Sequence, residues 1–279
     1  MGKYIDLHTH SNHSDGTMTP RELVYHAKES GLSAISLTDH DCIGGVSEAL
    51  ATGREIGLEV VPGIEFSVQS DTETHILGYY INPEADTIKQ VLPEILRVRK
   101  ERTEDTAQKL SELGFKVTYE EARAKAGGDL IGRAHFAKVM VEKGYVSSVK
   151  EAFDEYLGSG KTAFSSKQFL TAEDALRVIK ESGGVSFVAH LHLIRLNDAD
   201  LFDFLKRMKD AGLTGIEGYY TEYTKEMHEK YMAMAKELSL AISGGTDFHA
   251  GTKPHIKIGK GYGELEIPYS VLDGIKSLI

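Results

Sequence analysis

The chain has 279 residues but a single cysteine, Cys42, and it contains no run of about 18 or more apolar residues. One cysteine cannot form an internal disulfide, which fits a reducing cytoplasm. The lack of a long apolar run argues against a membrane-spanning helix. The first residues also lack the basic-then-apolar pattern of a secretory signal, because Asp6 and His8 interrupt it. We therefore expect a cytoplasmic protein without a membrane partner.

Positive charge is also scarce. Lys and Arg number 32 against 42 Asp and Glu, so the formal net charge is −10. This balance argues against electrostatic binding of extended duplex nucleic acid over a broad surface. It does not exclude a polyanionic substrate, because bound divalent cations would change the local sign. Histidine, in contrast, is abundant, with 12 residues.

Short β-rich runs alternate with helical patterns, which predicts an α/β fold. The first helix has a clear start, because Thr19 suits the N-cap, Pro20 suits the first helical position and Glu22 completes a capping box. The expected strands are 4–7, 34–37, 59–61, 76–81, 185–189, 215–218 and 241–244. Further helices are expected at about 46–57, 86–113, 172–182, 198–211 and 224–238.

The β–α alternation fails between residues 100 and 168. "ERTEDTAQKLSELG", "TYEEARAKAG", "GRAHFAKVMVEKG" and "SVKEAFDEYLGSG" indicate short helices, with turns at Gly114, Gly127–Gly128 and Gly144. We expect residues 100–168 to form a helical insertion that covers the active site of a barrel built from 1–99 and 169–279. Residues 66–78 could form a β-hairpin rather than a βα unit, because their link is short and polar.

Residue types that bind metals follow most of the predicted strands. They are His8, His10, Asp39, His40, Glu65, His190, Glu217, Asp247 and His249. In a closed α/β barrel the ends of parallel strands converge on one face, so residues far apart in sequence can line one pocket. His8 and His10 point the same way along a strand and could bind one ion together. Nitrogen and oxygen ligands without a thiolate suit Zn²⁺, Mn²⁺ or Fe²⁺.

Each of these motifs is weak evidence alone, because a His-x-His pair is often exposed and a residue after a strand is often a helix cap. Their repeated coincidence with strand ends favours a metal centre. The set holds more ligands than one ion needs, which indicates two or three ions. Glu65 could then bridge two of them.

The motifs "DLHTHSNHSDG", "LTDHD", "GIE", "HILGY", "VAH" and "GGTDFH" resemble, in this order, the polymerase-and-histidinol-phosphatase (PHP) family of metal-dependent phosphoesterases. The resemblance implies a distorted (β/α)₇ TIM-like barrel, the PHP fold, with a trinuclear site. It implies one ion held by His8, His10, Glu65 and Asp247, a second held by Glu65, His75 and His190, and a third held by Asp15, His40 and His249.

Asp15 in "SDG" and the segment "GRAHFA" resemble one branch of that family, which includes phosphatases of nucleoside 3′,5′-bisphosphates and 5′-to-3′ exoribonucleases acting on short RNA. The expected partner is therefore a phosphorylated small molecule, a nucleotide or a short RNA 5′-end. One departure is Leu191, where many relatives have proline, so the loop after His190 could differ from theirs.

As a mechanism we expect a hydroxide that bridges two ions to attack phosphorus in line. Asp247 would be essential, and either His249 or His192 could supply the proton of the leaving oxygen. Phosphate oxygens favour forked donors. The expected substrate contacts are Arg133, His135 and Arg195.

Three other classes compete with this interpretation. A histidinol-phosphatase-like enzyme would share the metal site but act on another phosphomonoester. Metal-dependent amidohydrolases also begin with His-x-His, but they commonly bridge their metals with a lysine after a middle strand, where this chain has Glu65. A non-enzymatic module of a polymerase would be expected to lack ligands, and this chain retains an apparently full set.

Overall fold

The computed structural model describes residues 3–126, 131–165 and 169–279. Its seven strands form one sheet in chain order. They are β1 (Ile5–Thr9), β2 (Ala34–Leu37), β3 (Glu59–Ser67), β4 (His75–Tyr79), β5 (Val185–Val188), β6 (Gly215–Tyr220) and β7 (Ala241–Gly245). The sheet nearly closes into a barrel, because Thr9 at the end of β1 bridges Phe248 just after β7. Every strand expected from the sequence is present, most of them with shifted ends.

The strand β4 runs against its two neighbours, whereas the other strand pairs are parallel. Ser67 at the end of β3 pairs with His75 at the start of β4, so the hairpin interpretation is confirmed. The reversal places the first residue of β4 at the barrel edge where the parallel strands end. His75 therefore reaches the same face as residues that follow strands.

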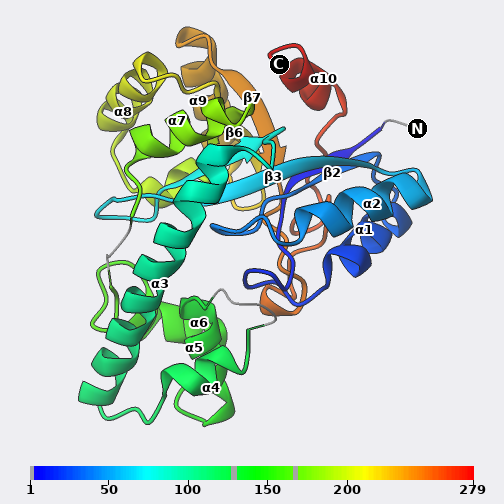
Figure 1. The fold of residues 1–279 in the computed structure, drawn as a ribbon. Coiled ribbons are helices and arrows are strands. Elements are labelled where there is room, and N and C mark those ends of the chain that lie inside the picture. The colour runs from blue at the N-terminus through cyan, green and yellow to red at the C-terminus, as the bar shows by residue number, and fades with distance from the viewer. Residues whose placement is uncertain (1–2, 127–130, 166–168) are drawn as a thin grey trace.

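Helices cover the outside of the barrel (Figure 1). They are α1 (Pro20–Glu29), α2 (Val46–Ile56), α7 (Ala172–Glu181), α8 (Asp198–Asp210) and α9 (Lys225–Glu237). The predicted start of α1 is confirmed, since Thr19 and Glu22 form a reciprocal capping box. The helix α10 (Ser270–Lys276) lies at the opposite end from the site, where Ile267 and Leu272 pack with Ile5 in one apolar cluster.

The long helix α3 (Asp86–Glu112) leads from the barrel into a lobe of α4 (Tyr119–Arg123), α5 (Arg133–Glu142), α6 (Val149–Ala152) and a π-helical turn at Phe153–Leu157 (Figure 1). "ERTEDTAQKLSELG" is thus not a separate short helix but the second half of α3, because the buried face of α3 continues through Thr103, Thr106 and Leu110. Gly114 and Gly144 take positive φ at the expected turns. The expected turn at Gly127–Gly128 lies outside the described residues.

The lobe has an apolar cluster of its own, which includes Leu110, Phe136, Met140 and Leu157. Helix α3 crosses the boundary expected at residue 99, so the division of the chain into a barrel and an insertion stays a prediction. No helix within the three described ranges combines the length and the apolar character needed to cross a membrane.

Candidate metal centre

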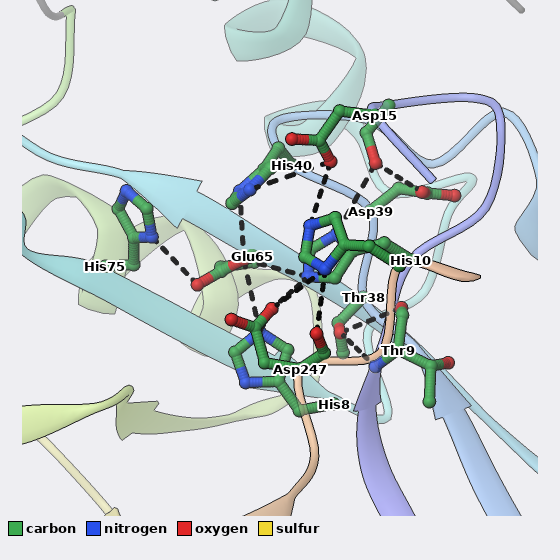
Figure 2. A network of polar contacts seen from close by, with 12 residues as sticks. His8, Thr9, His10, Asp15, Thr38, Asp39, His40, Glu65, His75 and Asp247 are labelled. Carbon is green, nitrogen blue, oxygen red and sulfur yellow. Dashed lines mark hydrogen bonds and ion pairs between the residues drawn. The ribbon is translucent and has the colours of Figure 1, made fainter. Parts of the chain in front are cut away.

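Glu65 on β3 lies at the middle of the site and is fully buried (Figure 2). One oxygen, Oε2, lies 3.2 Å from His8 Nε2 and 3.3 Å from His10 Nε2. The same oxygen lies 2.9 Å from His40 Nδ1. The ends of β1, β2 and β3 therefore bring three imidazoles to a single carboxylate oxygen, as the strand-end argument predicted.

The second oxygen of Glu65, Oε1, faces two other imidazoles. It lies 2.9 Å from His75 Nδ1 and 3.0 Å from His190 Nε2. His190 lies two residues after the end of β5, with the irregular dihedrals φ 25° and ψ 61°. Glu65 thus has a different set of imidazoles at each oxygen, which is the arrangement a bridging carboxylate requires.

Asp247 and His249 follow β7 and complete the cluster. Asp247 Oδ1 lies 3.2 Å from His10 Nε2 and 3.5 Å from His8 Nε2. His249 Nε2 lies 3.0 Å from Asp15 Oδ1. All the ligands that the resemblance implied therefore converge on one face of the barrel.

The atoms that face one another in this cluster fit divalent ions. Several are buried and make no hydrogen bond to the described residues, namely His8 Nε2, His10 Nε2, Asp15 Oδ1, His40 Nδ1 and Glu65 Oε2. Three groups bring their ligand atoms within 4.8 Å of one another: His10, Asp15, His40 and His249; His8, His10 and Glu65; and His40, Glu65 and His75. Bringing this many unpaired nitrogens and oxygens together without water would be costly unless a cation were bound there.

The electrostatics keep the carboxylates ionised. Burial alone would raise the pKa of Glu65, but the His40, His8 and His75 imidazoles outweigh it and hold that pKa well below its usual range. His249 and His40 lower the pKa of Asp15 against its burial, and Lys253 and His249 likewise lower that of Asp247. Burial, with His10 and Lys253 nearby, lowers the pKa of His249 to about 4. Ionised carboxylates and neutral imidazoles are the forms that bind metal, so an ion would displace protons from His8 and His10, whose pKa values the neighbouring carboxylates raise against their burial, that of His10 to about 9.

Asp39, another residue of the strand-end pattern, supports the loop that carries the first ligands. It accepts hydrogen bonds from the Ser11 backbone N–H at 2.8 Å, the Ser11 hydroxyl at 2.6 Å and the Ser14 hydroxyl at 2.6 Å. Both of its oxygens are used. The role that the contacts show for Asp39 is therefore to position the loop between His10 and Asp15.

The expected substrate contacts Arg133 and His135 lie on α5. Arg133 lines one pocket together with Glu73, His75 and Phe164, beside the ligand cluster. Its guanidinium lies 5.1 Å from the centre of the Phe164 ring. His135 is buried, and its Nδ1 accepts the backbone N–H of Gly132 at 3.0 Å. The lobe thus brings Arg133, though not the His135 Nδ1 atom, to the edge of the centre.

His192 and Arg195 lie outside the ligand cluster. His192 Nε2 pairs with Glu222 Oε2 at 3.0 Å, and the Tyr220 ring contacts both His192 and His190, at 5.5 Å and 5.8 Å. Arg195 is exposed, with φ 56°, and its guanidinium has no hydrogen-bond partner in the described part of the chain. The structure therefore brings neither side chain to the metal ligands.

Sequence reasoning missed several polar residues at the site. Lys253 Nζ lies 2.6 Å from Asp247 Oδ2, the oxygen that also accepts the Tyr220 hydroxyl at 3.0 Å. Arg99 and Arg102 lie on the buried face of α3. No local motif marks Arg99 and Arg102, because a basic residue in a charged helix ordinarily faces solvent.

A nearly closed α/β barrel with clustered imidazoles and carboxylates at one end defines a metal-dependent hydrolase. The model of the PHP domain family matches residues 6–249, and the chain therefore belongs to the PHP family of metal-dependent phosphoesterases.

Named relatives agree with this class. The chain is 33% identical over 250 residues to a 5′-3′ exoribonuclease of Haemophilus influenzae, covering 89% of this chain and 91% of the relative. It is 33% identical over 248 residues to a 3′,5′-nucleoside bisphosphate phosphatase of Chromobacterium violaceum, covering 88% and 87%. A crystal structure assigned as a metal-dependent phosphoesterase of Bifidobacterium adolescentis superposes with a TM-score of 0.88 at 27% identity, covering 99% of this chain and 96% of that one.

Proposed function

We propose that this enzyme hydrolyses the 3′-phosphoester of nucleotides that carry a 5′-phosphate, namely nucleoside 3′,5′-bisphosphates and the 5′-ends of short RNA. The proposed ligands of two or three divalent ions, Mn²⁺, Fe²⁺ or Zn²⁺, are His8, His10, Asp15, His40, Glu65, His75, His190, Asp247 and His249. The relatives support the choice of substrate, because one is named as a 3′,5′-nucleoside bisphosphate phosphatase and another as a 5′-3′ exoribonuclease.

The observation that carries this proposal is the state of Arg102. Its side chain is largely buried, at 6% exposure, and its guanidinium makes no hydrogen bond or ion pair to the described residues. Burial and the neighbouring Arg99 and Arg133 lower the pKa of Arg102 to about 9. A buried cation without a partner is costly. We infer that a substrate anion is its partner.

The neighbours of Arg102 extend this anion site toward the metal centre. Arg99 pairs with Asp41, the residue after the ligand His40. Arg133 donates to the Leu157 carbonyl at 3.1 Å and leaves Nη2 3.9 Å from Glu73. Arginine forks suit phosphate oxygens. A 5′-phosphate held by these arginines would leave the 3′-ester of the same nucleotide free to reach the ligand cluster.

Bound divalent ions would supply Lewis-acid charge for the phosphoryl oxygens and would bring the pKa of water toward neutrality. The chain itself keeps Asp247 in place, because Tyr220 and Lys253 hold its Oδ2 and leave Oδ1 for the centre. Of the two histidines considered for the leaving-group proton, only His249 lies in the cluster. As a proposed ligand whose pKa is lowered to about 4, however, His249 has no proton to give near neutral pH, so neither histidine is assigned this role.

The test compares adenosine 3′,5′-bisphosphate with adenosine 3′-monophosphate as substrates of the Mn²⁺-loaded protein. Arg102→Met should lower kcat/KM for the bisphosphate by about 10- to 100-fold, the value of one or two charged hydrogen bonds. It should leave the monophosphate rate unchanged. Arg97→Met is the matched control, because Arg97 lies on the same helix but is exposed and paired with Glu94 and Glu101.

Short RNA extends the same comparison. Wild-type protein should cleave 5′-phosphorylated RNA faster than 5′-hydroxyl RNA, and Arg102→Met should remove that preference. Equal losses on both adenosine substrates would show that Arg102 does not recognise the 5′-phosphate.

A further inference from the structure

A buried carboxylate, Glu217 on β6, contacts two of the proposed ligands without being one itself. Its Oε1 lies 2.9 Å from His8 Nδ1, and both side chains have no exposed surface. Its Oε2 accepts the backbone N–H of His190 at 2.7 Å. Across the described ranges, Glu217 lies outside the groups whose ligand atoms come within 4.8 Å of one another.

The turn that Glu217 holds has an uncommon backbone. The φ of His190 is 25°, in the positive region that a residue with a side chain rarely adopts. Such strain persists only where surrounding contacts enforce it. The next amide is also held, because Leu191 N–H donates to the Tyr223 hydroxyl at 2.8 Å. The same hydroxyl donates to the Glu217 carbonyl oxygen at 3.1 Å, which connects the turn to β6 twice.

The contact with His8 sets which ring nitrogen is available to an ion. Because a carboxylate can only accept, His8 must carry a proton on Nδ1. Its Nε2 then faces Glu65 Oε2 at 3.2 Å and Asp247 Oδ1 at 3.5 Å. A histidine that ligates metal through one nitrogen typically donates its other N–H to such a carboxylate.

We propose that Glu217 is a positioning residue that orients His8 and His190 together for the metal centre, and that Tyr223 braces the His190 turn. Glu217 thereby links ligands that lie on opposite sides of Glu65, one facing Oε2 and the other facing Oε1. This inference depends on the metal centre of the proposed function but not on its substrate.

The Glu217→Gln variant tests this positioning role most directly. In Glu217→Gln the amide offers one acceptor and one donor group where two donors must be met, the His8 ring N–H and the His190 backbone N–H. Either the His190 turn or the His8 proton must then rearrange. The metal-free variant should bind Mn²⁺ about 10- to 100-fold more weakly than the wild-type protein does. A titration monitored by electron paramagnetic resonance measures this affinity.

A second variant keeps the test decisive if Glu217→Gln does not fold. Tyr223→Phe removes one hydroxyl from the brace and should weaken Mn²⁺ binding by about 2- to 10-fold. Tyr219→Phe is the matched control, since Tyr219 lies on the same strand as Glu217 and its hydroxyl takes no part in the network. The melting temperature of each metal-free variant shows whether fold stability alone has changed.

A folded Glu217→Gln protein with wild-type Mn²⁺ affinity would overturn the inference, and so would unchanged affinity in Tyr223→Phe if only that variant folds. A lower melting temperature with unchanged Mn²⁺ affinity would make Glu217 merely structural. Wild-type protein that binds no Mn²⁺ would overturn the metal centre itself. Wild-type protein that binds Mn²⁺ but releases no phosphate from the bisphosphate would refute the substrate and leave this inference standing.

Discussion

Asp6 is a buried residue of β1 that connects this strand to the segments around Thr246 and Gly259, next to the site. Its carboxylate accepts the backbone N–H groups of Thr246 at 2.9 Å, Gly259 at 2.8 Å and His8 at 3.3 Å, and the Thr246 hydroxyl at 2.5 Å. Asp6→Ala would leave these donors buried and unpaired, so the free energy of unfolding should fall by about 3 kcal/mol or more. Urea denaturation of the metal-free protein measures this loss.

Asp6→Asn is the control for that loss. Burial raises the pKa of Asp6 to about 6, which shows that the buried charge itself is unfavourable in the wild-type protein. Asparagine keeps one acceptor and removes the charge, and it should therefore be milder than alanine. Equal urea midpoints for wild type and Asp6→Ala would contradict this account of Asp6.

His135 should make stability depend on pH. Burial lowers its pKa from 6.5 to about 4. Between these values the unfolded chain binds a proton that the folded protein does not, so the free energy of unfolding falls as pH falls through this window. The loss from this group approaches about 3 kcal/mol. The unfolding free energies of wild type and His135→Gln, measured without metal, should therefore converge from pH 7 to pH 4.5. Parallel curves would show that His135 is not held neutral.

At the scale of elements, the strand ends determine which ligands the sequence could reveal. His8, His40 and Glu65 follow parallel strands or lie at their ends, so the barrel argument is enough to place them together. His75 is the first residue of the antiparallel strand β4 and follows no strand end, so only the family resemblance implied it. No sequence pattern indicates a role for Arg102, because its burial depends on how α3 packs against the lobe.

The junction of β1 and β7 is the most crowded contact between strands at the site. A Cβ added to Gly245 would lie 2.2 Å from His8 Cβ, so no other residue fits without moving this ligand. Gly245→Ala should cost about 1–3 kcal/mol of stability and weaken metal binding. Gly274→Ala on α10 is the matched control, because its Cβ would meet no atom within 4 Å. It should be neutral or stabilise the protein by about 0.4–1 kcal/mol. Unchanged metal binding in Gly245→Ala would contradict the packing described for His8.

At the scale of the whole molecule, the proposed substrate recognition would be divided between two parts of the fold. The proposed ligands belong to the barrel, whereas Arg99, Arg102 and Arg133 lie on α3 and α5 (Figure 1). The alternation of strands and helices predicted an α/β fold with these helices, and the family resemblance implied the barrel. The alternation could not predict the position of the lobe, because that position depends on tertiary contacts of α3. The net charge of −10 does not oppose an anionic substrate here, because these arginines and bound divalent ions would supply positive charge locally.

The central claim is that the clustered imidazoles and carboxylates hold divalent ions that act on a nucleotide phosphoester. The most direct measurement is phosphate release from adenosine 3′,5′-bisphosphate by the Mn²⁺-loaded protein, with histidinol phosphate in parallel and Asp247→Asn as the control. The account predicts release from the bisphosphate that chelation abolishes and that Asp247→Asn lowers by at least about 100-fold. Full activity in Asp247→Asn, or release from histidinol phosphate alone, would contradict it.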